Sequence, residues 1–449
     1  MPSRNRAVTY HEIRDPIHAF VRLDSSEAQV VNSRPFQRLR YIHQLALTSL
    51  VYPAATHRRF EHCLGVMELA GRVYDVVTNP VNLLPEMRYL VPREKEHEFT
   101  YWRRVVRMAA LCHDLGHLPF SHGAEQLLPR GYGHEEISRD LIQSEIMAPL
   151  WSAMKLDPRD VAKIAVGAKH HPDQLDEWES ILSEIIIGDT FGVDRIDYLL
   201  RDSHHVGVAY GRFDHFRLID TIRILPKGDI GNPGPNRTSQ LTLPMAELQQ
   251  SDEVRREDAS KEPTLGIESG GLQSAEGLLW ARQFMWTQVY LHSTRQVYNL
   301  HLADFLSAWL EGGQFSINLE SHLSLTDNEV LAGLALAARD EGAPGHEPAK
   351  CIMERKHFRR VYEVKPTDKQ IALNAPEVIH AALVEKYGEQ KVKLKTRNPT
   401  SEGRHFPVLT SPGNVKVPLR FLRRLTECLL LPQETCMFIL MFAMTQSPG

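Results

Sequence analysis

The chain has 449 residues, of which 42% are apolar and 24% are charged, enough for a sizeable core and more than one structural unit. Its formal net charge is -4 and its pI is near 6.6. These values argue against a chain-wide basic surface, so nucleic acid is not an expected partner and any basic site must be local.

The N-terminal half reads as a series of helices. Residues 9–35 contain Asp15-Pro16 and Arg34-Pro35, which indicate a strand or loop lead-in rather than a long helix. Apolar residues then recur at spacings of three and four, predicting helices over 36–47, 62–77, 102–115, 135–150, 158–169 and 181–202. Gly116 and Pro119 predict that 115–122 is a helix end running into a tight loop.

The second half is less regular. Residues 226–263 are rich in proline, glycine and polar residues, which predicts a mobile insertion or linker. Helical periodicity returns over 274–310 and 327–339, and shorter mixed pieces follow. Residues 350–425 hold 17 Lys or Arg against 7 Asp or Glu. This basic tail is either a solvated face or a site for an activating nucleotide or a single strand.

These patterns predict a mainly α fold, a helical bundle with a small α+β C-terminal region. The expected division is a lead-in over 1–48, a core over 49–225, a flexible insertion over 226–263, a helical extension over 264–340 and a basic α+β region over 341–449.

The most informative stretch is Leu-Cys-His-Asp-Leu-Gly-His-Leu-Pro-Phe-Ser-His at 111–122. Polar groups in so apolar a context must be satisfied, because an unpaired one costs roughly 2–7 kcal/mol. His113 and Asp114 are adjacent at a helix end, and His117 lies one turn later. A single His-Asp pair is commonly structural, but a cluster of this kind indicates a metal site.

Further ligands are available on neighbouring helices. His62 begins one apolar helix, and Asp194 lies inside another. Two imidazoles and two carboxylates suit one divalent ion, which could be Mn, Fe, Mg, Zn or Ni, rather than a thiolate-selected metal. The candidate metal ligands are therefore His62, His113, Asp114 and Asp194.

Three segments together resemble the HD-domain phosphohydrolase superfamily, and more closely its deoxynucleoside triphosphate triphosphohydrolase branch. They are residues 51–62, the His-Asp-Leu-Gly-His run at 113–117, and residues 194–205. The resemblance implies an HD-domain helical bundle and hydrolysis of deoxynucleoside triphosphates to deoxynucleoside and inorganic triphosphate by a metal-activated water. It also implies a homo-oligomer.

The resemblance implies roles for other histidines. His122 is the expected acid that protonates the leaving 5′ oxygen, because an imidazole titrates close to neutral pH. His117 and His134 are expected to contact phosphate, and Glu135 to orient a histidine.

Substrate contacts follow in the same way. Arg59 and Arg195 match positions that hold phosphate, although both could be surface ion pairs. Tyr198 and Asp202, four apart on one helical face, match positions that meet the sugar 3′-hydroxyl, although such a pair alone would be read as packing. The other expected sugar contacts are Gln44, Leu45 and Tyr298. Two positions depart from the family: Ala46 replaces the usual glycine, and Tyr290 stands where the mammalian enzyme has an arginine.

Two other functions compete with this one. The same metal site could act on another nucleotide or on a DNA end, although the sequence lacks the HDxxED run of alarmone hydrolases and the GYP motif of cyclic-dinucleotide phosphodiesterases. A non-catalytic nucleotide sensor is the third hypothesis, and the complete ligand set argues against it.

The cysteines and the termini predict the cellular compartment of the protein. Five cysteines without a close Cys-x-x-Cys pair suit a reducing environment, so we expect a cytoplasmic protein. The N-terminus lacks an apolar signal segment, and Pro432 and Glu434 interrupt the most apolar stretch, near 428–444. We therefore expect neither a signal peptide nor a membrane span.

Overall fold

The computed structural model describes residues 10–93, 96–226, 263–363, 375–395, 406–411, 414–416 and 438–441. Within these residues the protein is mainly helical with small sheets, which confirms the predicted fold class. The insertion predicted for 226–263 lies outside the described residues except at its two ends. None of the described helices is long and apolar enough to cross a bilayer.

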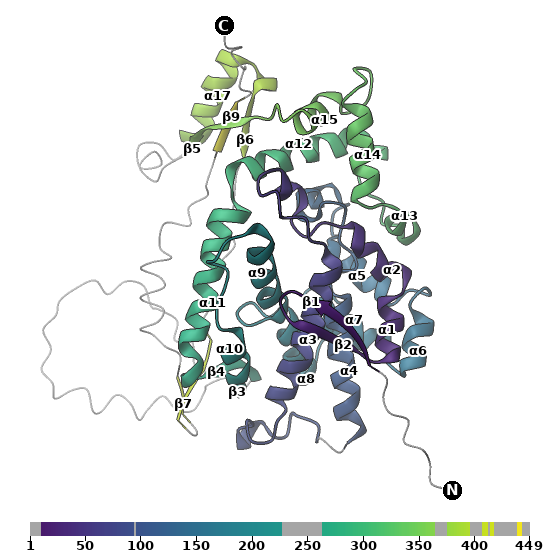
Figure 1. The fold of residues 1–449 in the computed structure, drawn as a ribbon, viewed down its shortest axis with the longest axis vertical. Helices are drawn as coiled ribbons and strands as arrows, with labels where there is room; N and C mark the ends of the chain where they lie inside the picture. The colour runs from purple at the N-terminus through teal and green to yellow at the C-terminus, as the bar shows by residue number, and fades with distance from the viewer. Residues whose placement is uncertain are drawn as a thin grey trace, which may run out of the picture.

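The helices fall in two groups along the chain. The first comprises α1 Ser25–Val31, α2 Arg34–Arg38, α3 Arg59–Val77, α4 His97–Cys112, α5 His134–Ile142, α6 Ala148–Met154, α7 Pro158–Val166, α8 Glu177–Ile187, α9 Val193–Val206 and α10 His215–Thr221. The second comprises α11 Leu272–Met285, α12 Ser293–Trp309, α13 Leu319–Ser324, α14 Asp327–Ala337, α15 His346–Met353 and α17 Ala375–Tyr387. Helix α3 packs against both α4 and α9, while α7 packs against α4, α5 and α8 (Figure 1).

Three small sheets lie around this bundle. The antiparallel hairpin is formed by β1 His11–Asp15 and β2 Ala19–Leu23, with Asp15 opposite Ala19. A second sheet has the order β3 Ile222–Pro226, β4 Pro263–Glu268, β7 Val408–Ser411 and β8 Asn414–Lys416, in which only β4 and β7 pair in parallel. The third, beside α17, has the order β5 Arg359–Glu363, β9 Phe438–Met441 and β6 Val392–Lys395 (Figure 1).

Two long predicted helices are each broken in the structure. The segment 135–150 divides into α5 and α6, because Pro149 has no N–H to donate and its ring clashes with a preceding helical turn. The segment 181–202 divides into α8 and α9 around Gly188 and Gly192. A methyl group at Gly188 would lie 2.2 Å from the carbonyl oxygen of Glu184. This break starts a new helix at Val193, which places Asp194 in its first turn.

The predicted helix over 36–47 is also wrong in extent. Only α2 and two 3₁₀ turns, Leu39–Tyr41 and Ala46–Leu50, form in this part of the chain. Ala46 has a φ of 49°, a left-handed conformation that no regular helix contains.

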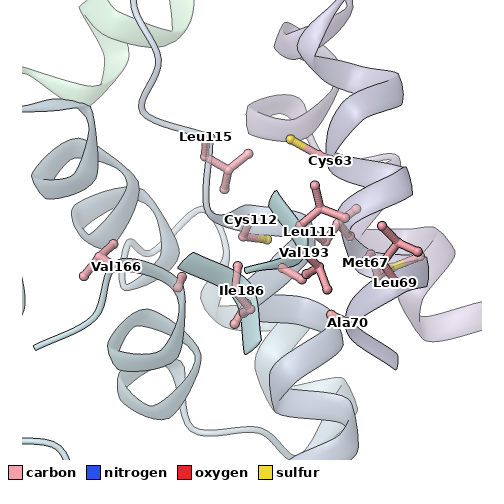
Figure 2. Packing of buried hydrophobic residues seen from close by; sticks show 14 of the residues in the cluster. Cys63, Met67, Leu69, Ala70, Leu111, Cys112, Leu115, Val166, Ile186 and Val193 are labelled. Carbon is pink, nitrogen blue, oxygen red and sulfur yellow. The ribbon is translucent and has the colours of Figure 1, made fainter. Parts of the chain in front are cut away.

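The core lies directly beneath the predicted metal ligands. Cys63, Cys112 and Val193 are all 0% exposed, and they are the sequence neighbours of His62, His113 and Asp194. Figure 2 shows these three residues converging from different helices with Met67, Leu111 and Ile186. Because close-packed interiors resist displacement, the packing of α3, α4 and α9 fixes where the adjoining polar side chains lie.

Candidate metal centre

The structure brings the four predicted metal ligands together from three distant parts of the chain. His62 lies near the start of α3, His113 and Asp114 directly follow α4, and Asp194 is the second residue of α9. His62 Nε2 lies 3.0 Å from Asp194 Oδ1 and 3.7 Å from Asp114 Oδ2. His113 Nε2 lies 3.5 Å from Asp194 Oδ1 and 3.4 Å from Asp114 Oδ1. Each imidazole therefore faces both carboxylates.

Hydrogen bonds on the far side of each ring orient the two histidines. His62 Nδ1 donates to Asp197 Oδ2 at 2.8 Å, and His113 Nδ1 donates to the carbonyl of Ala110 at 2.8 Å. Nε2 of each ring therefore faces the carboxylates, and that of His62 is hydrogen-bonded to Asp194 Oδ1 at 3.0 Å. An imidazole oriented through Nδ1 in this way is usual in metal-binding histidines. His113 Nε2 is buried and has no hydrogen-bond partner among the described residues. This mixed nitrogen and oxygen set fits one divalent ion.

The pKa values of the metal ligands are shifted by the buried carboxylates and cations that surround them. Burial alone would lower the pKa of His62, but hydrogen bonds to Asp194 and Asp197 outweigh burial and raise the pKa to about 10. Burial opposes ionisation of Asp114, yet the charges of Arg59 and His113 and a hydrogen bond from His117 hold its pKa well below the usual range. The carboxylates therefore stay charged and favour a cation between them.

Arg59 is buried beside the metal ligands. Its Nε donates to Ser121 Oγ at 2.9 Å, and its guanidinium pairs with the carboxylate of Asp114. The side chain is only 4% exposed, so the alternative of a surface ion pair is wrong for this residue. A guanidinium in this position can bind an anion held beside the metal ligands.

Two further histidines form one wall of the centre. The rings of His117 and His134 stack with centroids 3.9 Å apart, and His117 Nε2 lies 3.2 Å from Asp114 Oδ1. Burial and the positive charges of Arg59 and His134 lower the pKa of His117 well below its usual value. His117 is therefore a neutral imidazole near neutral pH.

The hydrogen bonding of His134 differs from the expectation. His134 Nδ1 bonds the carboxylate of Glu125, whereas Glu135 Oε2 lies 3.3 Å from the same nitrogen. Sequence reasoning missed Glu125 because the pairing crosses an irregular loop with no fixed spacing. His122 lies in the 3₁₀ turn Ser121–Gly123, and its side chain is outside the described part of the structure.

The predicted phosphate contact Arg195 lies beside the α8–α9 loop. Its Nη1 donates to the carbonyls of Gly188, at 3.1 Å, and Asp189. Tyr198 lies near it, and Arg282 of α11 is close enough that burial and the charge of Arg195 lower the Arg282 pKa. Two arginines brought together from different helices favour an anion nearby.

Asp202 is held in a hydrogen-bonded group rather than exposed to solvent. His57 Nε2 donates to Asp202 Oδ1 at 2.7 Å, and the Tyr290 hydroxyl donates to Asp202 Oδ2 at 2.6 Å. Tyr198 contacts Tyr290 edge to face. The structure therefore brings Tyr290, which departs from the mammalian sequence, against the predicted sugar contact.

The remaining predicted sugar contacts lie at the turn after residue 43 and on α12, which pack together. Gln44 Oε1 and the Tyr298 hydroxyl are buried without hydrogen-bond partners among the described residues. Leu45, which follows Gln44, is also buried. Buried groups of this kind need a hydrogen-bond partner, which water or a polar ligand can supply. The left-handed φ of Ala46 explains why glycine is usual at this position.

The loop after the metal ligands has a strained backbone and is fixed by a residue far away in the sequence. Phe120 and Ser121 have φ values of 57° and 55°. The backbone N–H of Phe120 donates to Asp327 Oδ1 at 2.7 Å, and that of His43 donates to Asp327 Oδ2 at 2.8 Å. Asp327 is fully buried at the start of α14 and was not predicted as a site residue. Strain of this kind persists only where surrounding contacts enforce it.

A cleft of about 840 Å³ opens from the metal ligands. His113, Asp114 and Asp194 line it, together with His134 and Glu135. Its lining also includes Lys169, His170, Ser180, Ser183, Asp189 and Thr190. The volume is within the range of nucleotide-sized ligand sites.

The sequence pattern of the HD domain matches residues 59–187, which contain three of the four converging ligands. The chain is an HD-domain protein. The pattern of the HD associated region matches residues 256–385 of this HD-domain protein, including α11 to α15.

Several relatives of this HD-domain protein share much of its length. It is 32% identical over 387 residues to an uncharacterized protein of Methanocaldococcus jannaschii, covering 84% of this chain and 66% of the relative. It is 33% identical over 243 residues to the human deoxynucleoside triphosphate triphosphohydrolase SAMHD1, covering 48% of this chain and 36% of that enzyme. The chain thus spans a third to two thirds of the length of these relatives.

A solved structure agrees with the fold over nearly the whole chain. The crystal structure of a hypothetical protein from Aquifex aeolicus has a TM-score of 0.72 and 28% identity, and the match covers 97% of each chain. The arrangement of the HD domain and the following helices is therefore shared with that protein.

Proposed function

We propose that the protein is a metal-dependent phosphohydrolase that converts deoxynucleoside triphosphates to a deoxynucleoside and inorganic triphosphate. The observation that carries the proposal is the convergence of His62, His113, Asp114 and Asp194 with both Nε2 atoms turned toward the carboxylates. The relative named deoxynucleoside triphosphate triphosphohydrolase supports the substrate class. A divalent ion held by these residues would lower the pKa of water and neutralise phosphate oxygens.

The residues around the metal ligands have distinct tasks. Water adds to the α-phosphorus and releases a proton, and the bond from that phosphorus to the 5′ oxygen breaks. The 5′ oxygen takes up a proton from His122, which regains one from solvent. Arg59 and the neutral His117 bind phosphate oxygens, and His134 is oriented for the same task by Glu125 and Glu135. No protein nucleophile is required.

Different groups of residues bind the phosphate end and the sugar end of the substrate. Arg195 and Arg282 bind the far end of the phosphate chain, where the two cations lie close together and Arg282 is partly desolvated. Asp202 and Tyr198 bind the 3′-hydroxyl, and Gln44, Leu45 and Tyr298 enclose the sugar. A close side chain at Leu45 disfavours a 2′-hydroxyl, which is the basis for deoxyribose selectivity.

The test is product analysis. The purified full chain is incubated with Mn²⁺ and each of the four deoxynucleoside triphosphates, and the products are separated by ion exchange. We expect inorganic triphosphate and deoxynucleoside, with activity lost in Asp194→Ala and retained in the surface control Asp75→Ala, whose carboxylate pairs with the partly exposed Arg103. Release of monophosphate or pyrophosphate without triphosphate would rule out the proposed substrate and favour hydrolysis of another nucleotide.

Two partner hypotheses belong to the same proposal. Adding GTP to the assay tests an activating nucleotide, because activation should raise turnover of the other deoxynucleotides. Light scattering after size exclusion tests the expected homo-oligomer. Mn²⁺ and nucleotide binding without turnover, under all these conditions, would favour the sensor.

A further inference from the structure

A buried network of side-chain hydrogen bonds connects the N-terminal hairpin to the metal ligand His62. Asp197 lies one helical turn after Asp194 on α9 and is fully buried. Its Oδ2 accepts a hydrogen bond from His62 Nδ1 at 2.8 Å, and its Oδ1 accepts one from His18 Nε2 at 2.6 Å. His18 is in the turn between β1 and β2.

Arg201 links Asp197 to a second residue of the hairpin, Asp15. Its Nε and Nη2 donate to Asp197 Oδ2 and Oδ1 at 2.8 and 2.9 Å, and its Nη1 donates to Asp15 Oδ2 at 2.8 Å. Asp15 Oδ1 in turn accepts from the backbone N–H groups of Ile17 and His18, both at 2.8 Å. The turn that carries His18 is therefore built around the partner of Arg201.

The helices that carry this hydrogen-bond network, α3 and α9, are closely packed. A methyl group at Gly65, one turn after His62 on α3, would lie 2.0 Å from Asp197 Oδ1 and 2.5 Å from Arg201 Nη2. The two oxygens of Asp197 already accept four hydrogen bonds, from His18, His62 and both Nε and Nη2 of Arg201. Asp197 therefore cannot turn its carboxylate without breaking a buried hydrogen bond, which is costly.

We propose that the β1–β2 hairpin is a positioning element of the metal centre. His18 fixes the carboxylate of Asp197, and Asp197 fixes the ring of His62 so that Nε2 is presented to the metal. His18 is a positioning residue and contacts neither metal nor substrate. The inference rests on the metal centre of the proposed function and is independent of the substrate.

The experiment measures metal affinity. The Mn²⁺ dissociation constant of the metal-free full chain is determined by calorimetry, well below each variant's unfolding midpoint, for His18→Leu, His18→Gln and the control His11→Leu. His11 is exposed on the same hairpin. Loss of an outer partner typically weakens metal binding about 10–100-fold, so we expect about a tenfold rise for His18→Leu. His18→Gln keeps a donor and should stay within about threefold, and His11→Leu should match the wild type.

A spectroscopic readout separates positioning from general destabilisation. With Co²⁺ in the site, the visible absorption bands report ligand geometry, and we expect them to shift in His18→Leu but not in His11→Leu. If His18→Leu does not fold, Asp197→Asn replaces it, with an expected rise of at least about tenfold in the dissociation constant. Wild-type affinity and spectrum in the folded variant would overturn the inference.

The outcomes also separate this inference from the proposed function. If the wild type binds Mn²⁺ and the His18 variants differ as expected, but no deoxynucleotide is hydrolysed, only the substrate assignment fails. If the wild type binds neither Mn²⁺ nor Co²⁺, both the metal centre and this inference are overturned.

Discussion

The hydroxyl of Tyr290 donates to Asp202 Oδ2 at 2.6 Å, across 88 residues of sequence. His57 donates to the other carboxylate oxygen at 2.7 Å, so Asp202 is oriented before any sugar arrives. Tyr290 follows α11 in the π-helical turn Trp286–Tyr290, outside the matched HD domain. A helix of the associated region thus contributes to the expected sugar site.

Tyr290→Phe should therefore impair sugar binding. Without the hydroxyl, Asp202 loses one of its two fixed donors, and a lost hydrogen bond to a charged group is worth about 1.5–3 kcal/mol. We expect kcat/KM for deoxynucleotides to fall about tenfold or more, mainly through KM. Steady-state kinetics beside Tyr89→Phe, which removes a surface hydroxyl bonded to Glu177, provide the comparison. Equal kinetics in both variants would contradict the role given to Tyr290.

Arg59→Ala should make stability more dependent on metal. Asp114 loses its guanidinium partner, and an unpaired buried carboxylate costs about 3–5 kcal/mol when no cation replaces the partner. Because Mn²⁺ would supply that charge, its addition should raise the Tm of Arg59→Ala by more than it raises that of the wild type. Differential scanning fluorimetry measures both shifts. Arg72→Ala, which breaks a half-exposed pair with Glu68, should respond to metal as the wild type does.

Gly65→Ala should destabilise the fold at the junction of α3 and α9. The added methyl group meets Asp197 Oδ1 at 2.0 Å, so the helices must separate or the ion pair with Arg201 must break. Overpacking of this kind costs about 1–3 kcal/mol or more. Urea unfolding followed by circular dichroism gives the value. In Gly277→Ala on α11, the methyl group meets no atom closer than 3.3 Å, and the change should stay within about 1 kcal/mol of wild type.

Acid should weaken the contact between α12 and the segment before β5. His301 Nε2 accepts a hydrogen bond from the backbone N–H of Phe358 at 3.2 Å, which requires a neutral ring. Burial, with a further contribution from the positive charge of Lys393, outweighs Asp304 and lowers the His301 pKa to about 4. The unfolded chain protonates near pH 6.5, so this contribution is complete above that pH and is lost as the pH falls toward 4.

His301→Gln keeps an acceptor but cannot titrate. We therefore expect its Tm to fall less than that of the wild type between pH 7 and pH 4. Thermal unfolding at half-unit pH steps measures the difference. Parallel curves for the two proteins would show that His301 does not contribute to the acid dependence.

Local signals predicted the presence of helices better than their ends. Apolar spacing located α3, α4 and α7, but a single periodic pattern ran through Pro149 and through Gly188. Those breaks depend on backbone geometry, which apolar spacing does not report. The short strands of the C-terminal region pair across long separations, as β5 does with β9, and such pairings leave little local signal.

The predicted ligand set came from residue types, whereas the residues that orient it could not be found that way. His62, His113, Asp114 and Asp194 belong to recognisable motifs that the fold brings together. Asp197, Glu125 and Asp327 act through contacts between distant segments, and each alone resembles an ordinary polar residue. Their roles depend on tertiary packing rather than on spacing.

The hydrogen bond from the Phe120 N–H to Asp327 links the two matched regions of the protein. The carboxylate lies more than two hundred positions beyond the amide that it stabilises, on a helix of the associated region. A fragment that stops after α10 would keep every metal ligand and still lose the acceptor that shapes the loop next to them. The conformation of the loop beside the metal ligands therefore depends on both matched regions.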